Sequence, residues 1–489
     1  MKHKGSALNV HSYLLKNAIK SITHFQKKLY FCKNKILKPY QSIPVAFHIM
    51  AKPFGAVCNL DCSYCYYLEK EKMYDATELF RMSEQTLEKF IDEYIAAQNV
   101  PVVQFVWHGG EPTMLGIDYY KKALDLQSQY SRGRTIENVL QTNGTLLNDD
   151  WCRFFRDNHF LIGISIDGPE HIHDRYRLNK AGKPSFAQVM RGLELLVKHQ
   201  VEFNTLSVVN DYNAQYPLET YRFLKSTGSR YMQFTPIVER RTTHLSENAM
   251  QLLSGSDQTE NRMAPWSVKA IDYGRFLCDV FDDWVIHDVG TYFVPTFDSI
   301  LANWVGSMTS ICVHAETCGH AGAIEHNGDL FACDHYVFPE YKLGNIHTNS
   351  LVSMMYSQCQ IKFGQAKRNA LPQYCRDCEY LFACNGECPK NRIIYTPSGE
   401  SGLNYLCSGL RIFYAHVAPY MDFMAEELAN ERPPANVMTW ARERIKSKPA
   451  VISAPVVKPV TKQAIKPNDT CPCGSGKKYK QCCRNKSNF

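Results

Sequence analysis

Short apolar segments alternate with longer amphipathic segments between residues 44 and 240. The apolar segments have the length of buried strands, whereas the segments between them place apolar residues at helical spacing. Strands are predicted at residues 45–50, 102–107, 136–141, 161–166, 203–209 and 231–236. Helices are predicted at residues 83–97, with Ser83 as the N-cap, and at residues 186–198. Strands and helices in this order predict an α/β fold with a partial (β/α)6 barrel of the TIM type.

The sequence changes character on both sides of this predicted barrel. A polar stretch leads to a helical pattern near residues 273–285, so residues 241–300 are expected to form a connecting helical region. Cysteines then become frequent, and a cysteine-rich domain is predicted over residues 301–430. Residues 431–467 are expected to form a flexible linker, because the chain becomes rich in Lys, Pro and Val beyond Trp440. The linker leads to a small cysteine module at residues 468–489, and a basic extension of residues 1–43 precedes the barrel.

Composition narrows the class of protein. A hydrophobic fraction of 45% is enough for a folded core, and the net charge of +7 lies largely at the two ends of the chain. We expect these basic ends to be solvated. The alternative is weak attraction to ribosomes, nucleic acid or an acidic client. No specific nucleic-acid partner is predicted. No apolar run reaches the roughly 18 residues of a membrane span, and no export signal is evident. The 19 cysteines form short-spaced clusters, which favours metal binding in the cytoplasm over disulfides.

The first cysteine cluster follows the first predicted strand. Cys58, Cys62 and Cys65 have the spacing C-x3-C-x2-C, and three thiolates can hold three corners of a [4Fe-4S] cluster while one iron stays open. A zinc site is the alternative, but zinc sites usually present four ligands. The spacing, with Tyr64 before the third cysteine, resembles that of radical S-adenosylmethionine (SAM) enzymes. In those enzymes the amino and carboxylate groups of SAM occupy the open iron.

Polar residues also follow other predicted strands, at the barrel end where active sites lie. Gly109 and Gly110 would let the backbone approach SAM, and Glu111 would accept a hydrogen bond from its ammonium group. The end of the fourth strand brings Ser165 and Asp167, which suit the ribose or the methionine moiety of SAM. Arg177 would pair with the SAM carboxylate. The alternative for the two glycines is an ordinary turn. For Ser165, Asp167 and Arg177 the alternative is loop capping and a surface ion pair.

Nine cysteines lie in the region from residue 312 to residue 407, and eight of them form a pattern that suffices for two fully ligated cubane clusters. These eight are Cys312, Cys318, Cys333, Cys375, Cys378, Cys384, Cys388 and Cys407. Two zinc sites are the main alternative. The ninth, Cys359, is expected to be a small buried apolar residue, as are Cys32, Cys152 and Cys278.

Several motifs together resemble those of a known family. The Cys58 loop, the Gly-Gly-Glu-Pro segment at residues 109–112 and the eight-cysteine pattern resemble radical SAM enzymes with a SPASM domain. The segments FHIMAKP at residues 47–53, CNLDC at 58–62, CDHYV at 333–337 and KLGNI at 342–346 resemble the anaerobic sulfatase-maturating enzymes. The resemblance covers roughly residues 44–424. It implies that the protein oxidises a cysteine or serine to formylglycine and that this residue belongs to an unfolded or nascent sulfatase. It also implies three [4Fe-4S] clusters and SAM as cofactors, and an electron donor such as flavodoxin or ferredoxin.

The resemblance also assigns roles to residues. It places Cys312, Cys318, Cys333 and Cys388 on one auxiliary cluster and Cys375, Cys378, Cys384 and Cys407 on the other. Asp334 matches the catalytic base of the family, which takes the thiol or hydroxyl proton after a radical has removed a hydrogen atom. His108, where many maturases carry Gln, and Tyr67 match residues of the substrate pocket. The positions that match SAM contacts are Tyr64, Gly110, Ser165, Arg177 and Val238.

Two other functions remain compatible with these motifs. The first is a peptide maturase of the SPASM class, which would form thioether or carbon crosslinks in a small ribosomal peptide. The second is a non-enzymatic, metal-dependent adaptor that binds clients.

The last cysteines form a separate compact set. Cys471, Cys473, Cys482 and Cys483 suit one tetrahedral zinc ion, and the segment resembles the SEC-C motif. So short a segment cannot build a core, so Zn²⁺ would supply its folding energy. We expect it to recruit a client or a chaperone, with a disordered basic tail as the alternative.

Overall fold

The computed structural model describes residues 46–75, 79–242 and 261–447. The described residues up to Ala441 belong to one compact unit, and those from Arg442 to Ser447 belong to a second. The predicted N-terminal extension and the predicted zinc module lie outside the described residues. None of the described helices has the combination of length and apolar composition that crossing a bilayer requires.

Six parallel strands form the centre of the fold in the order of the sequence. They are β1 (His48–Lys52), β2 (Val102–Trp107), β3 (Thr135–Thr142), β4 (Leu161–Ser165), β5 (Phe203–Val209) and β6 (Met232–Pro236). Each strand except the last pairs in parallel with the next, as an unclosed (β/α)6 barrel requires. The predicted fold class is therefore confirmed.

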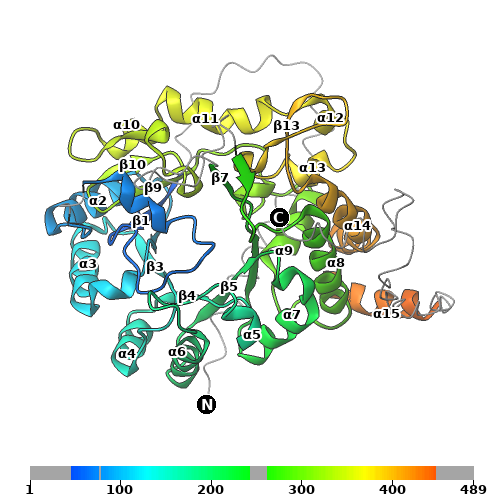
Figure 1. Ribbon diagram of the computed structural model, residues 1–489, viewed down its shortest axis with the longest axis horizontal. Coiled ribbons are helices and arrows are strands. Elements are labelled where there is room, and N and C mark those ends of the chain that lie inside the picture. The colour runs from blue at the N-terminus through cyan, green and yellow to red at the C-terminus, as the bar shows by residue number, and fades with distance from the viewer. Residues whose placement is uncertain (1–45, 76–78, 243–260, 448–489) are drawn as a thin grey trace, which may run out of the picture. The chain divides into compact units, whose positions relative to one another are not determined.

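Helices follow the strands and lie outside the curved sheet (Figure 1). They are α2 (Glu84–Ala97), α3 (Ile117–Tyr130), α4 (Asp149–Asp157), α5 (Glu170–His173), α6 (Phe186–Lys198) and α7 (Pro217–Ser226). The Ser83 side chain accepts a 3.1 Å hydrogen bond from the Thr86 N–H, so the predicted N-cap of α2 is confirmed. Fully buried aromatic residues of α2 and β2 fill the space between helix and sheet, among them Phe90, Phe105 and Trp107.

The sheet is wider than the six predicted strands. Three strands of the cysteine-rich region extend it past β1, namely β9 (Ala321–Glu325), β10 (Asp329–Phe331) and β11 (Lys342–Asn345). β9 pairs in parallel with β1, whereas β10 and β11 continue antiparallel. An unclosed barrel leaves the backbone groups of its first strand unpaired, and β9 provides partners for them. The predicted barrel and the predicted cysteine-rich domain therefore share one sheet.

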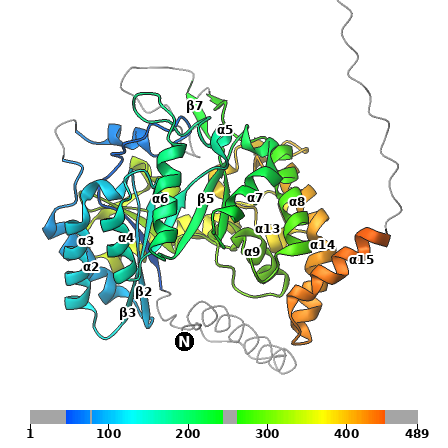
Figure 2. The ribbon, with the colours of Figure 1, turned by 90° about the horizontal axis from the view of Figure 1, so that it is seen from below.

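Long helices pack beyond β6. α8 (Ala270–His287), which contains the predicted helix at residues 273–285, lies beside α14 (Cys407–Ala429), as Figure 2 shows, and α9 (Pro295–Trp304) contacts α14. The two longest helices cross closely because both have a glycine at the contact. A Cβ atom on Gly409 would lie 1.6 Å from the Ala270 carbonyl oxygen, and one on Gly274 would lie 2.2 Å from that of Gly409.

The remaining strands have two or three residues each, and the remaining helices have at most twelve. They are β7 (Arg240–Thr242), β8 (Asn261–Met263), β12 (Ile394–Tyr395), β13 (Ser401–Leu403), α10 (Leu351–Met355), α11 (Gln358–Asn369), α12 (Gln373–Arg376), α13 (Leu381–Cys384) and α15 (Val437–Ser447). The 3₁₀ helices are η1 (Leu68–Met73), η2 (Pro112–Leu115), η3 (Asn213–Gln215), η4 (Cys312–His314), η5 (Asp334–Tyr336), η6 (Pro339–Tyr341), η7 (Pro389–Asn391) and η8 (Pro434–Asn436). The predicted flexible linker thus begins with the structured elements η8 and α15, because Val437 and Ala441 are buried and Trp440 stacks on Phe423. Its part beyond residue 447 lies outside the described residues.

Candidate active site and cluster-binding sites

The three-cysteine loop follows β1 and is tied to the barrel. Cys58 Sγ accepts hydrogen bonds from the Leu60 N–H at 3.4 Å and the Asn143 amide at 3.7 Å. Burial raises the pKa of Cys58 to about 12, and the nearby Cys65 contributes to this shift. Burial also raises the pKa of Cys62, and both other thiols add to it. The three thiols are therefore close neighbours, and a coordinated metal is what deprotonates such thiols.

The glycines after β2 pack against this loop. A Cβ atom on Gly110 would lie 1.9 Å from the Val57 carbonyl oxygen. Backbone hydrogen bonds join Gly110 to Gly55 and Glu111 to Val57, both at 2.8 Å. Gly109 has φ +122°, a conformation that glycine adopts easily. The glycines thus let two backbone segments approach each other, and their contact with SAM stays a prediction.

The carboxylate of Glu111 is fully buried and bonded to the protein. It accepts hydrogen bonds from the backbone N–H and hydroxyl of Thr113, from the Thr142 hydroxyl at 2.8 Å and from the Asn143 N–H at 2.7 Å. These contacts indicate that Glu111 holds the loops after β2 and β3 together. The predicted hydrogen bond from the SAM ammonium to Glu111 stays a prediction.

Three further residues of the predicted SAM site form one buried cluster. The Arg177 guanidinium lies across Asp167, with nitrogen–oxygen distances of 3.0 and 3.2 Å. The Tyr64 hydroxyl also donates to Asp167, which in addition accepts from the Val208 N–H at 3.0 Å. Arg177 thus pairs with a buried carboxylate of the chain, unlike the surface ion pair of the alternative interpretation.

Two predicted SAM contacts lie at the carboxyl ends of strands. Ser165 is the last residue of β4 and is buried, and Val238 lies buried two residues after β6. The Val238 carbonyl accepts a 3.0 Å hydrogen bond from Lys390. Both residues therefore occupy the barrel end where the cysteine loop lies, and their contact with SAM stays a prediction.

Asp334 lies at the centre of a buried polar network. Its Oδ1 forms an ion pair with Lys52, whose side chain is 0% exposed, and its Oδ2 accepts a 2.5 Å hydrogen bond from the Tyr66 hydroxyl. Burial raises the pKa of Asp334, but Lys52, His108 and His335 together lower it below its usual range. Asp334 is therefore an anion, as a proton acceptor must be.

His108 faces the same lysine and is uncharged. Its Nδ1 lies 3.3 Å from Lys52 Nζ and 2.6 Å from the Gly109 backbone nitrogen. Both neighbours are hydrogen-bond donors, so Nδ1 accepts and the network assigns the ring proton to Nε2. Burial, together with Lys52, lowers the pKa of His108 to about 3. His108 is therefore neutral, and its place in the substrate pocket stays a prediction.

Sequence reasoning missed Lys52 and Tyr66. Tyr67, the predicted pocket residue, donates its hydroxyl to Glu325 of β9, whereas its neighbour Tyr66 contacts Asp334. Lys52 Nζ also lies 4.0 Å from the centre of the Tyr67 ring. A lysine at the carboxyl end of a barrel strand was the available signal for Lys52.

The structure groups the eight cysteines of the second region into two sets. Burial raises the pKa of Cys333, and the nearby Cys388 and Cys312 add to the shift. The pKa of Cys388 is raised above all by burial and also by Cys318 and Cys312. The thiols that affect one another here are those of Cys312, Cys318, Cys333 and Cys388, which form the first set. The resemblance places these four on one cluster, and their ligation of it stays a prediction.

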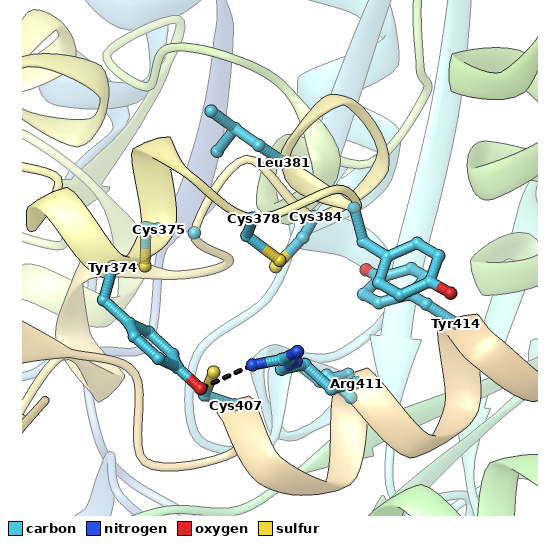
Figure 3. Close-up of a pocket in the computed structure, with 11 residues that line it drawn as sticks. Tyr374, Cys375, Cys378, Leu381, Cys384, Cys407, Arg411 and Tyr414 are labelled. Atoms are coloured by element: carbon cyan, nitrogen blue, oxygen red, sulfur yellow. Dashed lines mark hydrogen bonds between the residues drawn. The ribbon is translucent and has the colours of Figure 1, made fainter. Parts of the chain in front are cut away.

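The second set lines a pocket between α12, α13 and the start of α14. Figure 3 shows Cys375, Cys378, Cys384 and Cys407 around one space, with Tyr374, Leu381 and Tyr414 at its sides. Burial raises the pKa of Cys407 to about 11, with further contributions from Cys375 and Cys378. Four thiols around one mostly apolar space fit a fully ligated cubane cluster. Among the remaining cysteines, Cys152 and Cys278 are buried as expected, but Cys359 is exposed, so its prediction was wrong.

Family models match three parts of the chain. The radical SAM superfamily model matches residues 53–224, the iron-sulfur cluster-binding SPASM model residues 317–379, and the SEC-C motif residues 468–485.

Similar proteins cover most of the chain. The serine-type anaerobic sulfatase-maturating enzyme of Bacteroides thetaiotaomicron is 54% identical over 399 residues, which are 82% of this chain and 96% of that protein. The serine-type enzyme of Klebsiella aerogenes is 38% identical, with 78% and 87% covered. The cysteine-type enzyme of Clostridium novyi is 30% identical, with 78% and 98% covered. The solved structure described as native anSMEcpe with bound AdoMet and Cp18Cys peptide superposes with a TM-score of 0.68 at 27% identity, covering 78% of this chain and 99% of that one.

The fold and the three-cysteine loop define a radical SAM enzyme with a SPASM domain. This class implies [4Fe-4S] clusters and SAM as cofactors. Within it, the chain belongs to the family of anaerobic sulfatase-maturating enzymes.

Proposed function

We propose that this chain oxidises a serine of an unfolded or nascent sulfatase to formylglycine. Family membership supports the reaction type, and the observation that carries it is the anionic Asp334 held between Lys52 and Tyr66. The relatives at 54% and 38% identity are serine-type enzymes, whereas the cysteine-type relative is 30% identical, which supports serine as the target.

The proposed cofactors are three [4Fe-4S] clusters and SAM. Cys58, Cys62 and Cys65 would hold the cluster that binds SAM, and the two sets of four cysteines would hold the auxiliary clusters. When bound, SAM and its cluster supply the 5'-deoxyadenosyl radical that takes a hydrogen atom from the substrate β-carbon. Ser165, Arg177, Tyr64 and Val238 would position SAM.

The residues of the chain would complete the oxidation. Loss of the β-hydrogen leaves a carbon-centred radical whose hydroxyl is more acidic than that of serine, and loss of the electron makes removal of this proton easier still. Asp334 would accept this proton, and Lys52 and Tyr66 would hold its two oxygens in place. His108 and Tyr67 would line the substrate pocket. The auxiliary clusters, which the two sets of four cysteines would hold, would accept the remaining electron of the substrate, and the aldehyde of formylglycine would remain.

Three further features belong to this proposal. The cytoplasm would be the location, because it keeps cysteine clusters reduced. A flavodoxin or ferredoxin would exchange electrons with the clusters. The C-terminal module, in which Cys471, Cys473, Cys482 and Cys483 would bind Zn²⁺, would dock a client or a chaperone.

A paired peptide assay tests the proposed function. Reconstituted full-length protein is incubated anaerobically with SAM, a reductant and one of three sulfatase-motif peptides that carry Ser, Cys or Ala at the target position. The Ser peptide should become lighter by two hydrogen atoms in the mass spectrum, faster than the Cys peptide forms the same aldehyde, and the Ala peptide should stay unchanged. No aldehyde from either the Ser or the Cys peptide would rule out this function, and faster reaction of the Cys peptide would rule out the serine preference.

A further inference from the structure

The two sets of auxiliary cysteines are joined by a turn of unusual conformation. Cys384 of the second set and Cys388 of the first are separated by three consecutive residues with positive φ, namely Asn385 at 48°, Gly386 at 69° and Glu387 at 51°. Only glycine adopts this conformation without a steric cost, so two of the three residues are strained. Such strain persists only where surrounding contacts enforce it, and it is concentrated at functional sites.

Arg392 supplies these contacts. Its Nε donates to the Gly386 carbonyl at 3.0 Å, and its Nη2 donates to the Asn385 carbonyl at 3.1 Å. Its Nη1 reaches the Lys367 carbonyl at 2.5 Å. All these acceptors are neutral carbonyl groups, so the hydrogen bonds fix the guanidinium without neutralising its charge.

The charge of Arg392 acts on both sets of thiols. Burial lowers the pKa of Arg392, and Cys375, Cys318, Glu387 and Cys384 act in the opposite direction. Cys318 belongs to the first set, whereas Cys375 and Cys384 belong to the second. Other cations near the thiols act on one set each. Cys318 and Cys312 affect Lys367, whereas Cys378 and Cys407 affect Arg411.

Glu387 is the buried acid of the same region. Its carboxylate accepts hydrogen bonds from Asn404 at 2.6 Å and from Asn391 at 3.2 Å. The Arg392 guanidinium reaches only the backbone carbonyl of Glu387, at 3.5 Å, and among the described residues no ion pair joins the two side chains. The positive charge of Arg392 is therefore not neutralised by direct contact with this carboxylate.

We propose that the turn at residues 385–387, clamped by Arg392, is the bridge through which the two auxiliary clusters exchange an electron, with Arg392 stabilising the reduced state of both. This inference rests on the cluster ligands of the proposed function. When Asp334 has taken the substrate proton, one electron reduces the oxidised cluster of the first set. It then passes to the cluster of the second set and on to an oxidised flavodoxin or ferredoxin. Arg392 touches no reacting atom and is a positioning residue.

Redox titration of three variants tests the bridge. In Arg392→Gln, full iron content should remain, and both auxiliary midpoint potentials should fall, because a nearby positive charge favours the more negative, reduced cluster. The expected change is about tenfold in the ratio of reduced to oxidised cluster, or roughly 59 mV for one electron. Arg392→Lys, which keeps the charge, should hold both potentials near those of the wild type. Arg411→Gln is the matched control and should lower only the potential of the second cluster, by less, because Arg411 is exposed.

The outcomes separate this inference from the function on which it rests. In Arg392→Gln, unshifted potentials, a shift of one cluster alone or loss of iron would overturn the bridge. Turnover gives a second readout, since this variant should form less formylglycine per 5'-deoxyadenosine, and an unchanged ratio would also overturn it. A wild-type protein with fewer than three clusters would overturn the proposed ligands and the bridge together. Three clusters with unshifted potentials would overturn the bridge alone.

Discussion

Two buried ion pairs lie near the cysteine loop. Lys52 and Asp334 form a buried pair, and Arg177 pairs with the buried Asp167. A buried charge is costly unless it is paired, and such groups are found most often at functional sites. We therefore expect the reaction to take place near these two pairs, with Asp334 beside the proposed first auxiliary set and Asp167 beside the cysteine loop.

Replacing Asp334 tests its role as a base. Asp334→Asn should retain all iron and the reductive cleavage of SAM but lose formylglycine formation by about 10²–10⁴-fold, the usual contribution of a general base. Chromatography of 5'-deoxyadenosine and mass spectrometry of the peptide measure the two products. Formylglycine at the wild-type rate would refute the role.

Replacing Lys52 tests whether it holds Asp334 and His108 in place. Lys52→Met should lower formylglycine formation by about 10²-fold, because displaced catalytic groups lose that much, while SAM cleavage continues. Lys52→Arg, which keeps the charge, should recover part of the lost activity. Equal activity of the Met variant and the wild type would contradict the role, as would equal loss in both variants.

Lys70 offers a test of stability against pH. The residue is 2% exposed, and its buried ammonium has no hydrogen-bond acceptor among the described residues, although it lies 3.2 Å from the centre of the Phe338 ring. Burial lowers the pKa of Lys70 to about 7, against the raising effect of Glu239. An unfolded lysine titrates near 10.4, so the unfolded chain binds the proton more tightly. The folded state therefore loses stability as pH falls from about 10 to about 7.

Lys70→Met should accordingly raise the midpoint of thermal unfolding, more near pH 7 than near pH 10. Lys72→Met, at an exposed position of the same 3₁₀ helix, is the control and should change little. Differential scanning fluorimetry at the two pH values measures both. A destabilised Lys70→Met at pH 7 would contradict the cost assigned to the buried ammonium.

At the scale of elements, the close crossing of α8 and α14 positions the second auxiliary set. Cys407 begins α14, and Gly409, two residues later, has no room for a side chain against Ala270. The helix that carries one thiol of the second set is thus placed by glycine packing.

Gly409→Ala tests this crossing. Alanine favours a helix over glycine by about 1 kcal/mol, yet the clash should destabilise the protein by about 1–3 kcal/mol. We also expect loss of iron from the second auxiliary cluster. Ser408→Ala, at the exposed neighbouring position, should change neither property. Thermal unfolding and iron content are the measurements, and a more stable Gly409→Ala would show that helix propensity outweighs the packing.

Local patterns predicted some elements better than others. The bounds of β2, β5 and α6 were predicted to the residue, because each has a continuous apolar or amphipathic pattern between turn residues. β9 was missed, because it is only five residues long and is stabilised by pairing with β1, far away in the sequence. The same limit applies to the site. Cysteine spacing is local and predicted the cluster loop, whereas the contact of Lys52 with Asp334 depends on the folded chain.

For the whole molecule, one sheet connects the two halves of the proposed reaction. β1 leads into the cysteine loop, and its neighbour β9 comes from the region that carries Asp334 and the first auxiliary set. Asp334, the proposed base, contacts Lys52 at the end of β1 and Tyr66 directly after the cysteine loop, so it lies beside the proposed source of the radical. This arrangement predicts that hydrogen removal and proton removal occur at the same substrate carbon–oxygen unit.

Isotope transfer measures this directly. A peptide whose target serine carries deuterium on the β-carbon is incubated with the reconstituted protein, SAM and a reductant, and the 5'-deoxyadenosine is analysed by mass spectrometry. The 5'-deoxyadenosine should gain one deuterium atom for each formylglycine formed. Formylglycine accompanied by unlabelled 5'-deoxyadenosine would contradict hydrogen abstraction from the serine β-carbon.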